Sequence, residues 1–228
     1  MRTLYIPVPK WLLLGCTVIL TLAMLVFLRV NFLNQQALTT MSPSLFGKIV
    51  VIDPGHGGWD PGMKGSSGSA EAQVNLEIAQ KLANYCREAG ATVIMTREND
   101  QALGDTKAID MANRVELTAN TDIFISVHCN SYPGQHGAQV FYQKGNEEGK
   151  LLAESIQQSI IDKLANTDRV AMTHANSYLL KNIDGPAVIC ETGFLSDAQE
   201  EKLLLSDSYQ WDMAWAIFSG LIDYLSGQ

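Results

Sequence analysis

Two kinds of hydrophobic pattern alternate along the chain after residue 44. Short runs of β-branched and aromatic residues are typical of buried strands, and longer segments with apolar residues three or four positions apart are typical of helices. Strands are expected at residues 49–52, 91–95, 122–128, 137–142, 178–180 and 187–190. Helices are expected at residues 74–89, 108–119, 150–165 and 208–225. This alternation predicts a single α/β domain with a mostly parallel central sheet and helices on both faces.

An apolar segment near the amino terminus follows neither pattern. Residues 11–28 contain no charged residue, and the basic residues Arg2, Lys10 and Arg29 flank them. Eighteen apolar residues are just enough to cross a bilayer as a helix. We therefore expect one transmembrane helix before the folded domain. The expected organisation is a cytoplasmic amino terminus (1–10), a membrane anchor or signal-like segment (11–33), a linker (34–44) and the folded domain (45–228).

A cleaved secretory signal peptide is the main alternative to the anchor. Its apolar region would span about 7–15 residues and a small-x-small cleavage site would follow it, whereas residues 34–37 read NQQA. A buried helix of a soluble protein is less favoured, because no polar face interrupts the run. More basic residues precede the segment than follow it, which favours a cytoplasmic amino terminus and an exported remainder.

Composition and charge narrow the classes of partner. The 228 residues are 46% hydrophobic and 18% charged, as in an ordinary globular protein with a substantial core. Residues 1–44 hold three of the 16 basic residues and none of the 24 acidic ones, so the remainder has a formal net charge of −11. Binding a polyanion requires clustered lysine and arginine. We therefore expect no nucleic-acid partner.

Three chemically active side chains lie at or just after the ends of three of the expected strands. His56 lies in a glycine-rich loop directly after Asp53-Pro54, His128 ends a strongly apolar strand, and Glu191 follows another. The carboxyl ends of parallel strands meet at one edge of a sheet, where ligands of open α/β sheets bind. Two imidazoles and a carboxylate at that edge suit a metal site or a general-base site, and spacing alone does not distinguish the two.

Other hydrolytic and nucleotide-binding sites are disfavoured. No G-x-S-x-G nucleophile elbow occurs, since GSSGS at residues 65–69 lacks the final glycine. The glycine spacing at residues 57–62 resembles a phosphate loop, but Met63 stands where a lysine is required.

The cysteines are expected to be buried apolar side chains. Cys129 and Cys190 each adjoin one of the active side chains, and neighbouring residues of a strand point to opposite faces, so a cysteine nucleophile is disfavoured. With Cys86 they make an odd number beyond residue 44, so at least one is free or pairs with another chain.

Four sequence blocks resemble the signature blocks of the zinc-dependent N-acetylmuramoyl-L-alanine amidases. They are IDPGHGG at 52–58, EAQVNL at 71–76, FISVHCN at 124–130 and ETGFLS at 191–196. The resemblance covers about residues 47–226, with the blocks in the family's order. It implies that the domain at 45–228 is a catalytic domain that hydrolyses the amide bond between N-acetylmuramic acid and L-alanine in peptidoglycan.

The resemblance also implies roles for individual residues. His56, Glu71 and His128 would bind one zinc ion, and Glu191 would be the catalytic carboxylate. Three ligands leave a fourth position open, as expected of a catalytic zinc ion, although manganese or iron would accept the same ligands. Zinc would polarise the amide carbonyl, while Glu191 would take a proton from water and pass it to the leaving amine.

Four further residues have less definite roles. Arg114 and Asn130 stand in positions similar to the family's, where they contact the glycan or peptide of the substrate or else stabilise the fold by hydrogen bonds. Both alternatives remain open. His136 and His174 match no ligand block and are expected to be surface or structural residues.

The subtype within the family can also be predicted. Septum-splitting members often carry an inhibitory helix after the strand at 137–142, but only residues 143–149 precede the next expected helix. The chain is also short, begins with an apolar segment and shows no wall-binding repeat. It thus resembles the sporulation and germination-specific amidases, which remove stem peptides so that muramic-δ-lactam can form in the spore cortex.

This resemblance implies a cellular setting. The catalytic domain would lie on the extracytoplasmic side of a membrane, between the forespore membranes, or be secreted if the segment is cleaved. An activating partner protein would replace an internal lid. The alternatives are a vegetative cell-wall amidase acting in division or wall turnover, and a wall-binding module that has lost catalysis.

Overall fold

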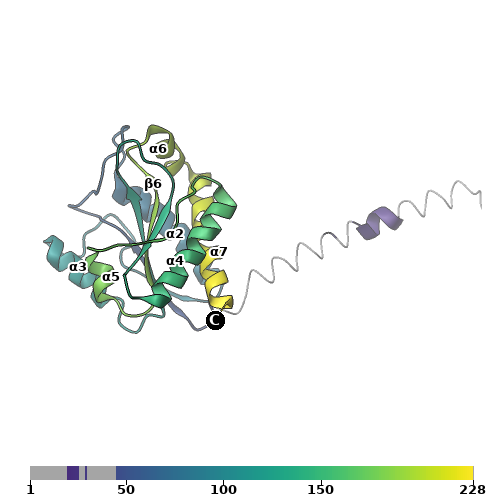
Figure 1. The fold of residues 1–228 in the computed structure, drawn as a ribbon, viewed down its shortest axis with the longest axis horizontal. Coiled ribbons are helices and arrows are strands. Elements are labelled where there is room, and N and C mark those ends of the chain that lie inside the picture. The colour runs from purple at the N-terminus through teal and green to yellow at the C-terminus, as the bar shows by residue number, and fades with distance from the viewer. Residues whose placement is uncertain (1–19, 26–28, 30–44, 228) are drawn as a thin grey trace, which may run out of the picture. The chain divides into compact units, whose positions relative to one another are not determined.

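The computed structural model describes residues 20–25, 29 and 45–227. The chain divides into two compact units, Met1–Ser42 and Pro43–Gln228, and the second contains the fold described below (Figure 1). None of the helices described is both long enough and apolar enough to span a bilayer. The anchor predicted at residues 11–33 lies mostly outside the described residues.

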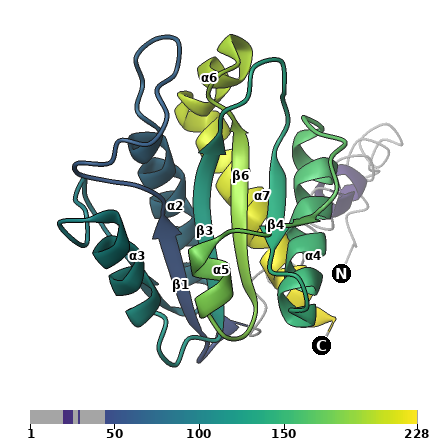
Figure 2. The ribbon, with the colours of Figure 1, turned by 60° about the vertical axis from the view of Figure 1, so that its left-hand side comes forward.

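A six-stranded sheet forms the centre of this unit. Its strands, in spatial order, are β2 (Thr92–Met95), β1 (Ile49–Pro54), β3 (Ile123–Asn130), β6 (Ala187–Phe194), β4 (Gln139–Tyr142) and β5 (Met172–Thr173). The first four are mutually parallel, whereas β4 runs antiparallel to β6 and pairs in parallel with β5. The prediction of a mostly parallel sheet is therefore confirmed. The last strand in the chain, β6, lies inside the sheet between β3 and β4 (Figure 2).

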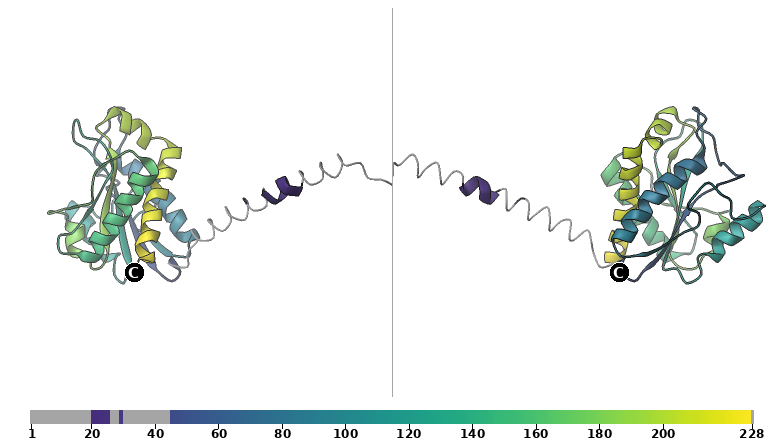
Figure 3. Two further views of the ribbon diagram at one scale, coloured as in Figure 1. Left: turned by 45° about the vertical axis from the view of Figure 1, so that its right-hand side comes forward. Right: turned by 180° about the vertical axis from the view of Figure 1, so that it is seen from behind.

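Helices cover both faces of the sheet, as predicted. The helices α2 (Glu71–Glu88), α4 (Glu147–Leu164) and α7 (Asp207–Ser226) cover one face, with α4 and α2 both packed against α7 (Figure 3). The shorter α3 (Lys107–Glu116) and α5 (Tyr178–Asn182) cover the other. A further short helix, α6 (Ala198–Leu204), follows β6.

Alternation along β1 shows how the sequence fills both layers. Val50 and Ile52 are fully buried in the core beneath α2 and α7, while Val51 is fully buried in the smaller core beneath α3 and α5. Successive side chains of a strand point to opposite faces, so a strand covered on both sides has to be apolar throughout.

The prediction of a strand at residues 178–180 is wrong, because these residues begin α5. The Ser177 side chain caps this helix by accepting a hydrogen bond from the backbone N–H of Leu180 at 3.2 Å. Leu179 and Leu180 are both buried against the same core. Two neighbours can share one face in a helix but not in a strand.

Two other differences concern short elements and element ends. β5 and α6 were not predicted from the sequence. They span only two and seven residues, too few to show a hydrophobic period. The predicted helix at 74–89 begins three residues earlier than expected, so Glu71 is its first residue. Only residues 143–146 separate β4 from α4, which confirms that no inhibitory helix lies there.

Candidate metal centre and active site

The loop after β1 carries His56 in an unusual backbone conformation. His56 has φ 61°, and Gly57 and Gly58 follow with φ 128° and 60°. Residues with a Cβ atom rarely adopt positive φ, so surrounding contacts have to stabilise this turn. Gly55 is required for a different reason. A Cβ atom at this position would lie 2.2 Å from the His128 ring. The loop therefore brings the two imidazoles together.

Two buried arginines hold this loop. The Arg114 guanidinium donates to the backbone oxygens of Pro54 and His56 at 2.9 and 2.7 Å. Arg97 donates to the oxygens of Pro54 and Gly55 at 3.0 and 2.9 Å. Both side chains are 1% exposed. Arg97 lies outside every recognisable motif, and the sequence contains no signal that would have identified it.

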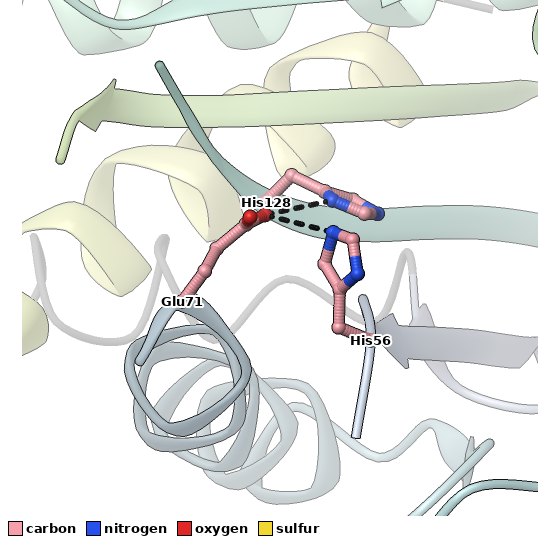
Figure 4. Close-up of side chains that lie close together, drawn as sticks. All are labelled: His56, Glu71 and His128. Carbon is pink, nitrogen blue, oxygen red and sulfur yellow. Dashed lines mark hydrogen bonds and ion pairs between the residues drawn. The ribbon is translucent and has the colours of Figure 1, made fainter. Parts of the chain in front are cut away.

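The three predicted metal ligands meet at the carboxyl edge of β1 and β3 (Figure 4). Glu71 Oε1 lies 3.2 Å from His56 Nε2 and 3.1 Å from His128 Nδ1. The three candidate ligand atoms all lie within 4.8 Å of one another. This arrangement could hold one metal ion, with two nitrogens and one oxygen as its ligands.

A second layer of contacts orients these side chains. The other ring nitrogen of His56, Nδ1, lies 2.9 Å from Asp60 Oδ2. The backbone N–H of Met63 donates to Glu71 Oε2 at 2.9 Å, and Asn75 Nδ2 donates to Glu71 Oε1 at 3.2 Å. A carboxylate behind a histidine and hydrogen bonds behind a carboxylate are the usual supports of metal ligands.

These contacts also shift the pKa values of the ligands. Burial alone raises the pKa of Glu71, but hydrogen bonds from His128 and His56 outweigh it and hold that pKa well below its usual value. Burial lowers the pKa of His56, but bonds to Glu71 and Asp60 outweigh it and raise the pKa. Glu71 is therefore ionised and ready to bind a cation.

Glu191 lies beside the ligands but differs from them electrostatically. It is the register partner of His128 in the pairing of β3 with β6. Its Oε2 atom is buried and has no hydrogen-bond partner in the part of the chain described. Burial raises the pKa of Glu191 to about 7. A carboxyl group that titrates near neutrality can both accept and donate a proton.

A cavity of about 620 Å³ adjoins these residues on the face covered by α3 and α5. Met111, Leu179 and Ile189 make part of its wall apolar, and Glu191 and Lys107 line it as well. Sites of this size, with an apolar wall and a few convergent polar groups, are typical of small-molecule and substrate binding.

His174 lines the same cavity, although it was expected to be a surface or structural residue. Its Nδ1 atom is buried without a hydrogen-bond partner in the described structure, and its ring makes an edge contact with Phe141 at 5.7 Å. Burial lowers the pKa of His174, which favours the neutral ring. It precedes α5 in a segment without periodicity, so no sequence signal points to it. His136 is exposed, as expected.

The structure supports a stabilising role for Arg114. Its guanidinium bonds Asp53 Oδ1 at 2.6 Å and Asp110 Oδ2 at 2.7 Å, in addition to the two backbone oxygens of the His56 loop. Substrate contact stays a prediction for Arg114, which also lines the cavity. It stays a prediction for Asn130 too, whose Oδ1 accepts a hydrogen bond from the N–H of Ser131 at 2.8 Å.

The cysteines face away from the site, as predicted. Cys129 and Cys190 are 3% and 1% exposed and belong to the core beneath α2 and α7. Both are free thiols, as is Cys86, and burial raises the pKa of all three. A thiolate nucleophile is therefore excluded at these positions.

Comparison with known proteins agrees with this geometry. The family model Amidase_3, described as N-acetylmuramoyl-L-alanine amidase, matches residues 50–223. The germination-specific N-acetylmuramoyl-L-alanine amidase of Bacillus subtilis is 37% identical over 231 residues, which cover 95% of each chain. The amidase LytC of the same organism is 31% identical over 78% of this chain, a region that covers 36% of LytC.

Solved structures show the same fold. The CwlD amidase of Clostridioides difficile, determined in complex with the GerS lipoprotein, is 34% identical, with a TM-score of 0.77. The match covers 80% of this chain and 100% of that one. The catalytic domain of the amidase CwlV from Bacillus (Paenibacillus) polymyxa is 30% identical over 79% of this chain and 99% of that one, with a TM-score of 0.71. The chain therefore belongs to the Amidase_3 family of N-acetylmuramoyl-L-alanine amidases.

Proposed function

We propose that this amidase hydrolyses the bond between N-acetylmuramic acid and L-alanine with one zinc ion held by His56, Glu71 and His128. The observation that carries the proposal is the convergence of their three ligand atoms within 4.8 Å, beside the cavity that Glu191 lines. The donor set fits zinc, because two imidazoles and one carboxylate form a known catalytic zinc site. Manganese and iron also accept these ligands, so metal analysis has to distinguish the three.

The chain's own residues supply the proton transfers. When bound, zinc would act as a Lewis acid on the amide carbonyl and would lower the pKa of water. Glu191 accepts the proton of the attacking water through its unpaired Oε2 and then donates it to the departing amine of L-alanine. In the metal-free chain burial raises the pKa of Glu191 to about 7, and a bound cation would lower that pKa and favour the carboxylate that accepts the proton.

The cavity positions the substrate for this reaction. Its apolar wall, which includes Met111 and Leu179, limits the water around the reacting amide. His174 and Lys107 supply polar groups on the same wall for the sugar or the stem peptide. Arg97 and Arg114 keep the His56 loop fixed, so the catalytic groups need little rearrangement when the substrate binds.

We further propose that the chain removes stem peptides from spore cortex so that muramic-δ-lactam can form. Support comes from the germination-specific relative, whose alignment extends over 95% of both chains. A vegetative wall amidase is the second candidate. It ranks second because the identity to LytC is lower and the aligned region covers only 36% of that longer protein. Deleting the gene and measuring cortex δ-lactam by muropeptide analysis separates the two. Unchanged δ-lactam would contradict the cortex role.

We propose an anchored, extracytoplasmic location for the catalytic domain. The support is the uncharged run at residues 11–28 with its basic flanks. Membrane fractionation of the native protein, with mass spectrometry of its amino terminus, tests this. A mature chain that starts after residue 33 would establish a cleaved signal peptide instead.

An activating partner protein is part of the same proposal. The similar CwlD amidase was solved in complex with the GerS lipoprotein, and this chain has no helix between β4 and α4 that could block its own site. Copurification from sporulating cells tests whether a partner is bound. A chain that is fully active alone at physiological zinc concentrations would contradict the need for one.

The activity itself can be tested with purified peptidoglycan. The full-length protein in detergent is incubated with and without chelator, and the products are identified by mass spectrometry. Free stem peptides that begin with L-alanine, lost with chelator and restored by zinc, are the expected result. Products with a free reducing sugar but an intact lactyl amide would show a different activity.

A further inference from the structure

A buried carboxylate outside the metal centre binds the loop that leads to Glu71. Glu201 on α6 is 3% exposed and accepts hydrogen bonds from the hydroxyl groups of Ser66, Ser67 and Ser69. The last two are 2.6 and 2.7 Å long, and the backbone N–H of Ser67 also donates, at 3.0 Å. These residues belong to the GSSGS segment at 65–69, here called the serine loop.

Glu201 fits closely into the curve of the serine loop. A Cβ atom on Gly65 would lie 2.0 Å from Glu201 Oε1 and 2.5 Å from Ser69 Oγ. No lysine, arginine or histidine of the described chain lies within ion-pair distance of Glu201. The serine donors instead hold the pKa of Glu201 at about 2, so the group is charged throughout the physiological range. The charge of Glu201 is thus stabilised by hydrogen bonds from the serine loop.

The serine loop connects directly to the metal ligand. Lys64 and Ala70 form an antiparallel bridge at its base. Next to this bridge the N–H of Glu71 donates to Met63 O at 2.9 Å, and the N–H of Met63 donates to Glu71 Oε2 at 2.9 Å. The same two-residue contact therefore fixes both the backbone and the carboxylate of Glu71.

The first turn of α2 lacks a side-chain cap, although the N–H of Ala72 donates to Pro61 O at 3.1 Å and Arg97 donates to Ala72 O at 2.7 Å. Its N-cap residue, Ala70, makes no side-chain hydrogen bond to the helix. Alanine is among the poorest N-cap residues, and a helix without a cap frays at its first turn. Glu71 is the first residue of that turn, so the backbone bonds at the base of the serine loop contribute to its position, together with the hydrogen bonds that its Oε1 accepts from Asn75 and from the N–H of Cys129.

We propose that Glu201 is a positioning residue for the metal centre, which fixes the serine loop and through it the carboxylate of Glu71, and so sets the affinity for zinc. The inference rests on the proposed function, because it takes Glu71 to be a zinc ligand. Supports behind a metal ligand typically change metal affinity 10- to 100-fold when they are removed. A carboxylate held in place before the metal arrives loses less freedom on binding.

The test compares zinc affinity with stability in the full-length protein in detergent. The variants are Glu201→Ala, the triple variant Ser66→Ala, Ser67→Ala, Ser69→Ala, and the two combined. Lys202→Ala, an exposed position on the same helix, is the control. Zinc dissociation constants come from competition with a chromophoric chelator, and thermal unfolding of the metal-free protein reports stability.

The expected result is a zinc affinity about 10- to 100-fold weaker for Glu201→Ala and similarly weaker for the triple variant. The combined variant should be no more than about twofold weaker than Glu201→Ala, because both changes remove the same interaction. Lys202→Ala should bind zinc like the wild type. Should Glu201→Ala not fold, the triple variant provides the same measurement with α6 intact.

Each contrary result has a distinct meaning. Folded Glu201→Ala or triple variants that bind zinc within about twofold of wild type would overturn the positioning role, even if their melting temperatures fall. Additive losses in the combined variant would overturn the shared interaction. A wild-type chain that binds no zinc would overturn the metal centre itself, and the inference with it.

Discussion

At the scale of single residues, the unpaired oxygen of Glu191 allows the most direct test of the chemistry. Glu191→Gln keeps the shape of the side chain but removes its ability to take a proton. We expect turnover to fall about 10²- to 10⁴-fold, the usual contribution of a general acid–base group, while zinc content stays at the wild-type level. Stem-peptide release and metal analysis on the same preparation check both parts. Wild-type turnover in a zinc-loaded variant would contradict the assignment.

The same residue makes the stability of the metal-free chain depend on pH. The folded-state pKa of Glu191 is raised to about 7 from 4.5, so the group favours the folded state below pH 4.5 and loses that contribution as pH rises through 7. The shift corresponds to at most about 3 kcal/mol. From pH 5 to pH 8, the free energy of unfolding in urea should therefore fall for the wild type relative to that of Glu191→Gln. An unchanged difference between the two proteins would show that burial does not perturb this carboxyl group.

His174 offers a test of substrate contact. His174→Ala removes from the cavity wall an imidazole that is not one of the proposed metal ligands. We expect KM to rise several-fold, by roughly the 1 kcal/mol typical of one hydrogen bond, with kcat and zinc affinity changed little. Exposed His136→Ala is the matched control. Steady-state kinetics on soluble muropeptides separates KM from kcat, and equal KM values for both variants would exclude the contact.

Some residues of the site could be predicted from the sequence and others could not. His56, His128 and Glu191 lie at or just after the ends of strands that the sequence predicts, and their meeting at one edge follows from parallel order. Glu71 begins a helix, where an acidic residue is ordinary, so only the family resemblance identified it. Arg97 acts through backbone oxygens that are close only in the folded chain, and no periodicity reveals such contacts.

At the scale of elements, Arg114 joins α3 to the loop after β1. Arg114→Met keeps much of the volume but leaves Asp53 charged, 0% exposed and without its cation. Removing one partner of a buried ion pair costs about 3–5 kcal/mol, and the freed loop should also weaken zinc binding. Arg87→Ala, which breaks the exposed pair with Glu98, should cost less than about 1 kcal/mol. Chemical unfolding compares the two, and similar costs would show that Arg114 is not essential to the fold.

Element type was easier to predict than the pairing of elements. Runs of apolar residues revealed β1, β3 and β6 because both of their faces are buried. The run that begins at Tyr178 was misassigned, since a short apolar run fits a strand and a single helical turn equally well. Hydrophobic patterns also carry no direction, so the antiparallel placement of β4 was not predictable.

At the scale of the whole molecule, metal binding should stabilise the fold. The proposed ligands come from the β1 loop, α2 and β3, so an ion that binds them joins three elements. At a free zinc concentration 100 times the dissociation constant, the expected gain is about 2.7 kcal/mol. Scanning calorimetry should show a melting temperature a few degrees higher with zinc than with chelator. Identical melting temperatures would contradict binding to the folded state.

The position of β6 inside the sheet has a consequence for the time at which the enzyme becomes active. All three proposed ligands lie in the first 128 residues, whereas Glu191 arrives with the strand that is synthesised last and has to pair with β3 and β4 at once. A nascent or truncated chain therefore contains the groups for metal binding before it has the proton carrier. If Glu191 carries the proton as proposed, a chain that lacks β6 should be able to bind zinc but not to hydrolyse peptidoglycan.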